Sequence, residues 1–288
     1  MIKQSFSPVL LIDLSYLIFY RYYAIITWFK NSHREETFPK DYQWYQNTEF
    51  MEKFDKLFLK RVHEIAKQYN ISHQQYYFVQ DCPSDTIWRK AFFPDYKEQR
   101  KVFYKSSSWQ GGPVFKHVYQ TLLPKLIQEL KCHHYRIPKL EADDIIYLLR
   151  EKFAAEFTRL KPSGPETSAK STAQNPQWRY VIITNDHDYL QLLDPHTELI
   201  NLQKKLLRTK SCGDPLIDLE KKIIGGDSSD NIPKCFPRCG KKTLDKLARD
   251  PKQLEQWFDK HSGSREKYLR NRLLIDFREI PEKYRALL

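Results

Sequence analysis

The sequence is poor in glycine and cysteine and contains no long hydrophobic run free of charge. Only 8 of the 288 residues are Gly, and no fixed repeat spaces them, which excludes collagen-like and solenoid proteins. The 5 Cys are an odd number without framework spacing, so we expect no disulfide scaffold and a reducing, intracellular location, cytoplasmic or nuclear. The most apolar stretch, residues 9–20, carries Asp13, and a central Asp costs about 2.5–3.5 kcal/mol on membrane insertion. We therefore expect no membrane association.

The rest of the composition is that of a folded, basic protein. Hydrophobic residues make up 41% and aromatic residues 14%, too many for a disordered chain. Lys and Arg number 48 against 36 Asp and Glu, which gives a formal net charge of +12. Such an excess favours a polyanionic partner such as nucleic acid.

Short apolar segments alternate with helical patterns along most of the chain, which predicts an α/β fold with a parallel sheet. The segments typical of buried strands are 9–12, 76–79, 134–137, 180–184 and 199–202. The helical patterns cover 48–69, 114–130, 143–157, 188–193, 252–259 and 264–275. Residues 161–177, rich in Pro, Ser, Thr and Ala, are expected to form a flexible surface insertion.

Carboxylates recur at or near the ends of the predicted strands. They are Asp13, Asp81, Glu141, Asp143, Asp144, Asp186, Asp188, Asp227 and Asp230. A single Asp after a strand often caps the next helix. Parallel strands, however, end at the same edge of a sheet, and nine carboxylates gathered there would not all stay ionised without cations. All-oxygen ligands select hard ions such as Mg²⁺ or Mn²⁺, whereas a zinc site is not expected because no Cys or His cluster has ligand spacing.

The order of these acidic segments resembles the 5′-nuclease family, which includes bacteriophage flap endonucleases and the N-terminal nuclease domain of bacterial DNA polymerase I. The most specific segments are 140–149 (LEADDIIYLL) and 225–233 (GGDSSDNIP). The resemblance extends from residue 9 to about residue 249. It implies a PIN-like fold: a mixed, largely parallel sheet flanked by helices, a helical arch, and a C-terminal helix-three-turn-helix module. Residues 1–212 would then form the catalytic domain, with the arch at about 84–112, and residues 213–288 the helical subdomain.

The resemblance also assigns roles to the acids. Asp81, Glu141, Asp143 and Asp144 match the residues around the family's first metal, with Asp13 beside them. Asp186, Asp188, Asp227 and Asp230 match those around the second. The implied cofactors are two Mg²⁺ or Mn²⁺ ions. The implied activity is hydrolysis of phosphodiesters in 5′ flaps or at the 5′ ends of duplex DNA, with exonuclease or endonuclease preference and RNA primers left open.

A basic segment between the second strand and the next helix matches the family's arch motif at Arg89, Tyr96, Lys97 and Arg100. In that motif the Lys and Arg contact the scissile phosphate, and the neighbouring Lys90 and Lys101 would add nucleic-acid contacts. We expect the arch helix to begin near Pro94, and Tyr96 and the nearby Phe92, Phe93 or Phe103 to be able to stack on an unpaired base. Phe92 and Phe93 are expected to anchor the arch in the core.

Residues 232–247 resemble the helical module that holds the duplex backbone, often through a Gly-rich turn with a bound K⁺. Here only Gly240 remains, and Lys234 and Arg238 stand where Gly is usual. This leaves two alternatives open: a K⁺ site, or phosphate contacts from side chains instead. The side chains concerned are Lys234, Arg238, Lys241 and Lys242.

Three classes of function remain after this comparison. A metal-dependent 5′ nuclease is favoured, with branched or 5′-ended duplex DNA or an RNA–DNA hybrid as substrate. A PIN-like single-strand ribonuclease would not need GGDSSDNIP or the basic helical module, and a non-catalytic binding module would not need nine intact acids. A monomer is expected, with a DNA polymerase or other replication protein as an open partner.

Overall fold

The computed structural model describes residues 8–105, 109–159 and 179–288. Within these residues, five strands form one sheet in the order β3-β2-β1-β4-β5, and every pairing is parallel. The strands are β1 Val9–Asp13, β2 Tyr76–Val79, β3 His133–Tyr135, β4 Tyr180–Ile183 and β5 Thr197–Ile200. The parallel α/β architecture is therefore confirmed, while no antiparallel strand of the expected mixed sheet occurs in the described ranges. The expected insertion at 161–177 lies outside them.

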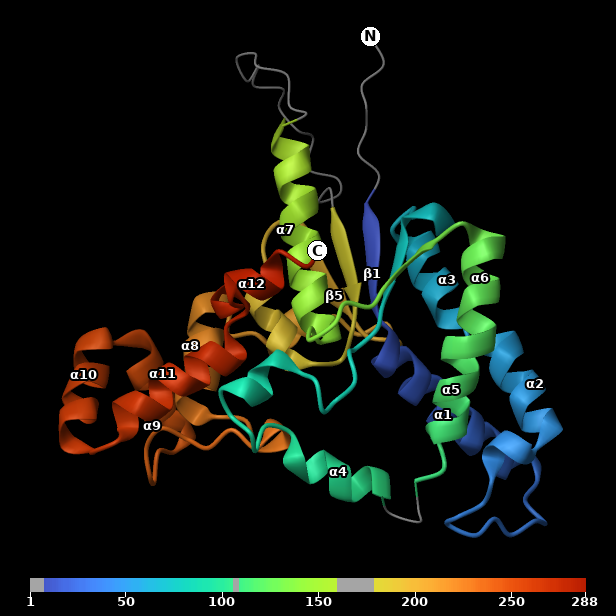
Figure 1. Ribbon diagram of the computed structural model, residues 1–288, viewed down its shortest axis with the longest axis horizontal. Helices are drawn as coiled ribbons and strands as arrows, with labels where there is room; N and C mark the ends of the chain where they lie inside the picture. The colour runs from blue at the N-terminus through green and yellow to red at the C-terminus, as the bar shows by residue number, and fades with distance from the viewer. Residues whose placement is uncertain (1–7, 106–108, 160–178) are drawn as a thin grey trace.

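Helices lie on both sides of the sheet and beside it (Figure 1). In chain order they are α1 Leu14–Ser32, α2 Thr48–Leu57, α3 Lys60–Gln68, α4 Glu98–Lys105, α5 Gly112–His117, α6 Leu123–Leu130, α7 Ala142–Arg159, α8 Pro215–Gly225, α9 Lys241–Arg249, α10 Pro251–Lys260, α11 Ser264–Ile275 and α12 Glu282–Arg285. A π-helical turn, Val118–Leu122, joins α5 to α6. Among the described helices, none has the length and apolar character needed to cross a bilayer.

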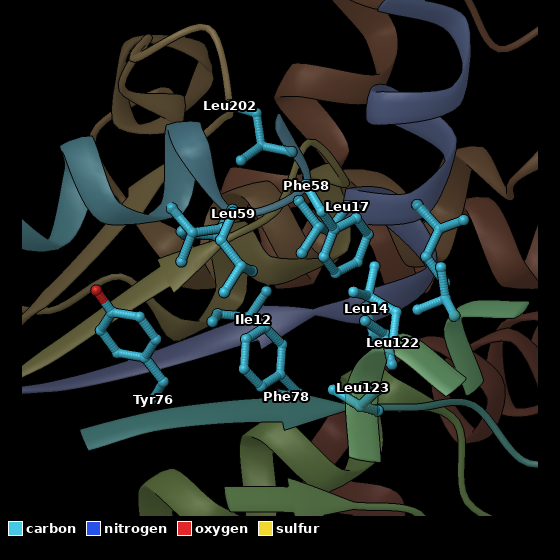
Figure 2. Packing of buried hydrophobic residues seen from close by; sticks show 14 of the residues in the cluster. Ile12, Leu14, Leu17, Phe58, Leu59, Tyr76, Phe78, Leu122, Leu123 and Leu202 are labelled. Carbon is cyan, nitrogen blue, oxygen red and sulfur yellow. The ribbon is translucent and has the colours of Figure 1, made fainter. Parts of the chain in front are cut away.

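The central strand β1 is apolar on both faces because both faces are covered. Leu10 and Ile12 pack in the cluster that includes α1, α2 and α3, whereas Leu11 packs in the cluster formed with α7. Figure 2 shows the first cluster, where Ile12 lies among Leu14, Leu59 and Phe78. These layers fix the sheet, and with it the positions of the residues that follow each strand.

The strand order places a topological switch point between β1 and β4. The chain runs from β1 outward through β2 to β3, and then returns to place β4 and β5 on the other side of β1. In open α/β sheets, ligands bind at such a point, outside the carboxyl ends of the strands. Asp13 is the last residue of β1, and Asp186 follows β4. The fold therefore brings acids to its usual ligand-binding edge.

Some elements differ from the sequence-based expectations. α1 was not predicted, because its own apolar residues are spread around most of the helix, which leaves little amphipathic pattern in its sequence. The single helix expected over 48–69 is two helices, interrupted at the buried Phe58 and Leu59. The arch helix α4 begins at Glu98, four residues after Pro94.

The C-terminal helices form a group beside the sheet that is also tied to it. α8, α9, α10 and α11 lie together in Figure 1. Phe277 and Ile280, which follow α11 in the chain, pack in the same hydrophobic cluster as α7. Within the group, the fully buried Asn271 donates hydrogen bonds to the carbonyls of Ile223 at 3.0 Å and Pro233 at 2.8 Å. Asn271 thus fastens the segment around Asp227 to α8 and α11.

We expect Asn271→Ala to lower the free energy of unfolding by about 1–3 kcal/mol, because it removes a donor from the Pro233 carbonyl and leaves the Ile223 carbonyl with only the weak donor of the Cys235 thiol. Thermal denaturation followed by circular dichroism measures this effect. Leu269→Ala, on the same helix but 58% exposed, is the matched control and should change stability little. Equal stability of the Asn271 variant and wild type would contradict this account.

Candidate active site

A cleft of about 790 Å³ opens at the carboxyl edge of the sheet. Six of the nine predicted acids line it: Asp13, Asp81, Glu141, Asp143, Asp186 and Asp227. Three cations, Lys97, Arg100 and Lys222, line it as well. Asp188 and Asp230 belong to a carboxylate group with Asp227, and Asp144 to one with Glu141 and Asp143. The structure therefore brings all nine acids to one region.

Some of these acids also cap a helix. Capping and clustering are therefore both true of the same residues. An oxygen of Asp13 accepts from the Tyr16 amide at 3.0 Å, and Asp186 accepts from Asp188 at 2.9 Å. Asp81 accepts from the Ser15 hydroxyl at 2.6 Å and from the Ala142 amide at 2.8 Å, which links β2 to the start of α7. Each bond fixes a carboxylate and still leaves it further acceptor sites.

Beneath the cleft, Arg89 and Asp144 form a buried ion pair. Arg89 is 1% exposed and Asp144 is not exposed at all. The guanidinium donates to both oxygens of Asp144, at 2.7 and 2.8 Å, and to Glu141 at 2.9 Å. Its Nε donates to the Leu274 carbonyl at 2.7 Å. Trp88 completes the arrangement by donating its indole N–H to Asp144 at 2.9 Å.

This pair bears on the roles expected of Arg89 and Asp144. Arg89 is enclosed by protein, so it does not contact a phosphate in the cleft in this structure. Both oxygens of Asp144 already accept hydrogen bonds from Arg89 or Trp88, and the Glu141 amide donates to Asp144 as well, at 3.1 Å. Through these contacts the two residues join the arch segment, α7 and α11.

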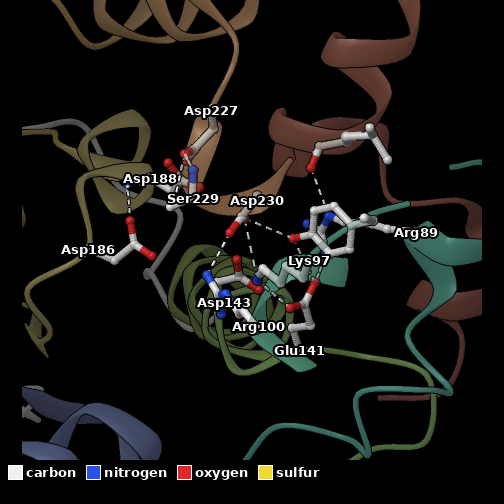
Figure 3. A network of polar contacts seen from close by, with 12 residues as sticks. Arg89, Lys97, Arg100, Glu141, Asp143, Asp186, Asp188, Asp227, Ser229 and Asp230 are labelled. Carbon is white, nitrogen blue, oxygen red and sulfur yellow. Dashed lines mark hydrogen bonds and ion pairs between the residues drawn. The ribbon is translucent and has the colours of Figure 1, made fainter. Parts of the chain in front are cut away.

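The arch segment approaches the acids through Tyr96 and through Lys97 and Arg100, which Figure 3 shows beside Glu141 and Asp230. Lys97 adopts a left-handed backbone, φ 57°, and donates its N–H to the Asp230 carbonyl at 3.0 Å. Its ammonium lies 2.6 Å from Glu141 and 3.5 Å from Asp230. Arg100 donates to Asp230 at 2.6 Å.

Tyr96 is 2% exposed, and its hydroxyl lies within hydrogen-bond distance of Glu141 (3.1 Å) and Asp230 (3.2 Å). A ring buried in this way cannot stack on a base, so that expectation does not fit the structure. Phe92, expected in the core, is 46% exposed, whereas Phe93 packs against a buried cluster. Lys90 is partly buried and Lys101 pairs with Glu98 at 2.9 Å on the exposed face of α4.

Lys222, in the last turn of α8, is a site residue that the sequence analysis missed. Its ammonium contacts Asp188 and lies 2.9 Å from Asp227. Burial favours the protonated acid, but Lys222 and hydrogen bonds from Ser229 outweigh it and lower the pKa of Asp227 to about 2. The position of Lys222, five residues before Asp227 and followed by Gly225 and Gly226, is the signal that could have revealed it.

The electrostatics of the cleft fit a divalent cation. Burial and the charge of Asp81 raise the pKa of Asp13 to about 7, with Asp186 adding to the effect. Burial and the charge of Asp144 raise the pKa of Asp143 well above its usual value. Two groups of three acids each place carboxylate oxygens within 4.8 Å of one another. Oxygen ligands at this spacing, with ionisation suppressed by mutual repulsion, suit a hard divalent cation.

The predicted basic residues of the helical module lie on its surface. Lys234, Arg238, Lys241 and Lys242 are exposed, and Gly240 is the N-cap of α9. Gly240 makes no side-chain cap, and its φ of −82° is accessible to any residue. Cys235 and Cys239 are buried free thiols in the apolar cluster of this module.

Comparison with known proteins places this geometry in context. The sequence model of a family described as the 5′-3′ exonuclease, N-terminal resolvase-like domain, matches residues 8–161. The chain is 25% identical over 272 residues to a 5′-3′ exonuclease of Halalkalibacterium halodurans, covering 92% of this chain and 77% of that protein. It is 27% identical over 202 residues to DNA polymerase I of Lactococcus lactis subsp. lactis, covering 66% of this chain. The chain spans only 20% of the length of that polymerase.

Solved structures of bacteriophage T5 proteins share the fold. The T5 5′-exonuclease with bound zinc superposes with a TM-score of 0.62 at 16% identity, covering 97% of this chain and 96% of that one. The T5 D15 flap endonuclease, in a pseudo-enzyme–product complex with DNA and metal ions, gives a TM-score of 0.61 at 16% identity, covering 97% and 95%. At this identity the likeness establishes the fold.

The raised pKa of Asp13 predicts how the stability of the metal-free protein depends on pH. The folded state holds a proton at Asp13 up to about pH 7, whereas an unfolded Asp loses it near pH 4. The stabilisation from this proton is therefore complete below pH 4 and is lost as pH rises through 7.

Asp13→Asn keeps a capping oxygen but cannot ionise. In EDTA the variant should be more stable than wild type at about pH 8, and this advantage should shrink at about pH 5.5. Melting temperatures at both pH values measure it, and a pH-independent difference would contradict the assignment.

Proposed function

The chain belongs to the 5′-3′ exonuclease family, and we propose that it is a structure-specific, divalent-metal-dependent 5′ nuclease. It would hydrolyse phosphodiesters in 5′ flaps or at the 5′ ends of duplex DNA. The observation that carries this proposal is the carboxylate cleft at the carboxyl edge of the sheet. There Lys97 and Arg100 of the arch segment form ion pairs with Glu141 and Asp230.

The metal ligands in this proposal are the acids that line or border the cleft. They are Asp13, Asp81, Glu141, Asp143, Asp186, Asp188, Asp227 and Asp230. Asp144 belongs to the same group as Glu141 and Asp143, and it also orients Arg89 and the start of α7. We propose Mg²⁺ or Mn²⁺ as the cofactor, because every ligand is a carboxylate oxygen. A pair of such ions supplies Lewis acidity, lowers the pKa of an attacking water and neutralises the leaving oxygen.

The chain's own cations then bind and orient the substrate. Lys97 and Arg100 neutralise Glu141 and Asp230 in the structure, and Lys222 neutralises Asp188 and Asp227. A phosphate in the cleft would compete with these acids for the same cations. Lys97 and Arg100 would hold the scissile phosphate, where charge develops in the transition state. Tyr96 would keep Lys97 in place by its contacts to Glu141 and Asp230.

We further propose that residues 213–288 form a DNA-binding subdomain of helix-three-turn-helix type, with residues 1–212 as the catalytic domain. Support comes from the exposure of Lys234, Arg238, Lys241 and Lys242 and from the uncapped start of α9, where amides attract phosphate. Lys90 and Lys101 would add contacts on the arch side. The K⁺ site remains a second alternative for the turn before Gly240.

The choice of DNA over other nucleic acids draws on the relatives. A T5 neighbour is a complex with DNA and metal ions, and the polymerase relatives suggest a place in DNA replication, with a polymerase as partner. A single-strand ribonuclease is the second candidate, and an RNA–DNA hybrid substrate lies between the two. The basic surface of α9 favours a substrate that contains a duplex.

Cleavage of labelled substrates tests the proposal. With Mg²⁺ or Mn²⁺, wild type should cleave a 5′-flap DNA and leave single-stranded RNA intact. Asp143→Asn should reduce the cleavage rate by a factor of 10² or more, on the order expected when a group stabilising transition-state charge is lost. Binding of the same DNA should persist or strengthen, because a negative charge is removed.

Asp85→Asn, which changes an exposed acid beyond β2, is the matched control. Preferential cleavage of the RNA would favour the ribonuclease, and wild-type cleavage by Asp143→Asn would remove that residue from the site.

Salt dependence tests the role of the helical module separately. Each phosphate neutralised by a Lys contributes about 0.9 to the slope of log K against log[salt]. Lys241→Ala combined with Lys242→Ala should lower the slope for duplex DNA by about one to two units, at any sequence. Cleavage of a saturating substrate should change little. Fluorescence-anisotropy titrations in Ca²⁺ measure the slope, and an unchanged slope would show that these lysines do not hold the duplex.

A further inference from the structure

A second hollow adjoins the carboxylate cleft, beyond the carboxyl end of β5. Its volume is about 380 Å³, a size at which pockets hold small ligands. Asn185 and His187, on either side of Asp186, line both the cleft and this hollow. The segment that follows β5 contributes to the rest of the wall through Lys205, Leu207 and Lys210. The reaction proposed above leaves this hollow without a role.

The turn that follows β5 is held in place by the chain's own hydrogen bonds. Asn201, 7% exposed, accepts at its side-chain oxygen from the amides of Gln203 at 3.0 Å and Lys205 at 2.9 Å. Its side-chain nitrogen therefore faces Asn185 and donates to the oxygen of that side chain at 3.1 Å. Because this oxygen already accepts a bond, Asn185 offers mainly N–H donors to a ligand. The wall between the hollow and the cleft is thus preorganised.

The cations of the hollow are not neutralised by the protein. Lys205 and Lys210 are exposed, and no described residue forms an ion pair with either, whereas the neighbouring Lys204 pairs with Glu64 at 2.9 Å. No acid is among the described residues that line the hollow. The three cations of the cleft, in contrast, each contact a carboxylate. An anion that enters the hollow therefore meets positive charge for which it does not compete with an acid.

We propose that this hollow binds a phosphate group of the substrate, next to the phosphate at the metal ions. Phosphate oxygens only accept hydrogen bonds, and the ammonium groups of Lys205 and Lys210 only donate them. The N–H groups of Asn185 add donors on the side of the cleft. Asp186 lies between two lining residues, so a strand bound in the hollow continues directly from the metal site. The hollow rests on the proposed nuclease function and would help to set which bond of the strand is cleaved.

The simpler interpretation is that Lys205 and Lys210 are solvated charges that attract DNA from all directions. Charges of this kind would strengthen the binding of any nucleic acid in proportion to its total charge. They would not depend on one particular phosphate. Dependence on a single phosphate position therefore separates the two interpretations.

Methylphosphonate substitution tests the hollow, because it removes the charge of one chosen phosphate and leaves the others in place. A series of 5′-flap DNAs carries one such group at successive positions on both sides of the junction, in either strand, and binding is measured in Ca²⁺. For wild type, the substitution at the position held by the hollow should weaken binding about 5- to 10-fold, the size of a charge-assisted contact at a partly exposed site. In Lys205→Ala combined with Lys210→Ala this loss should vanish, because the partner of that phosphate is already gone.

A second comparison distinguishes the two sources of phosphate. The same flap DNA is prepared with and without a phosphate at its 5′ end. A gain in affinity from the 5′ phosphate that occurs in wild type, but not in the variant lacking Lys205 and Lys210, would identify a terminal phosphate as the occupant. A coupled loss at an internal methylphosphonate would identify a phosphodiester. Either result supports the proposal.

Two control variants complete the experiment. Lys205→Arg combined with Lys210→Arg keeps both charges and should show the wild-type loss at the same position. Lys125→Ala combined with Lys152→Ala removes two exposed lysines of α6 and α7, outside the hollow. This variant has the same net charge as the one that lacks Lys205 and Lys210, and it should keep the position-specific loss of wild type.

The outcomes separate this proposal from the nuclease function. If the variant lacking Lys205 and Lys210 shows the same losses as wild type at every internal position, and the same effect of the 5′ phosphate, the hollow is not a phosphate site, even if the enzyme cleaves flaps. Position-specific coupling in a protein that cleaves no DNA with Mg²⁺ or Mn²⁺ would instead overturn the nuclease function alone.

Discussion

Repulsion among the carboxylates at the carboxyl edge of the sheet is the constraint on which the rest of the structure depends. The fold places these acids close enough that burial and neighbouring charge raise the pKa values of Asp13 and Asp143. Other acids contact a cation from another part of the chain: Arg89 and Lys97 for Glu141, Arg100 for Asp230, and Lys222 for Asp227. The same contacts attach the arch segment and the C-terminal helices to the sheet.

This arrangement links architecture to chemistry. In the proposed function, the cations that contact the acids in this structure bind phosphate once metal ions neutralise those acids instead. The left-handed backbone at Lys97, supported by the Asp230 carbonyl, holds its ammonium over the cleft at a conformational cost. The part of the arch segment before Lys97 is fixed by the buried Arg89, because the guanidinium of Arg89 binds both Asp144 and the Leu274 carbonyl.

The sequence alone was enough to predict the strands and the identity of the acids, because apolar runs that end in Asp are a local signal. The all-parallel sheet follows from the same alternation. The roles of Arg89, Asp144 and Tyr96 could not be predicted, because their burial depends on Trp88 and Leu274, which reach them only in the folded chain. Lys222 was missed although it stands five residues before Asp227, because its contact with the distant Asp188 forms only in the folded chain. α1 was missed because apolar and aromatic residues also occupy its less buried face, so its sequence carries no clear periodicity.

The central claim is that this edge of the sheet binds divalent cations through carboxylates. Electron paramagnetic resonance during a Mn²⁺ titration of the protein without nucleic acid tests it most directly. The account predicts two bound Mn²⁺ per chain, magnetically coupled as expected for ions about 4 Å apart, and displaced by Mg²⁺. A chain that binds no Mn²⁺, or binds it unchanged after Asp13, Asp143 and Asp186 are all replaced by Asn, would contradict it.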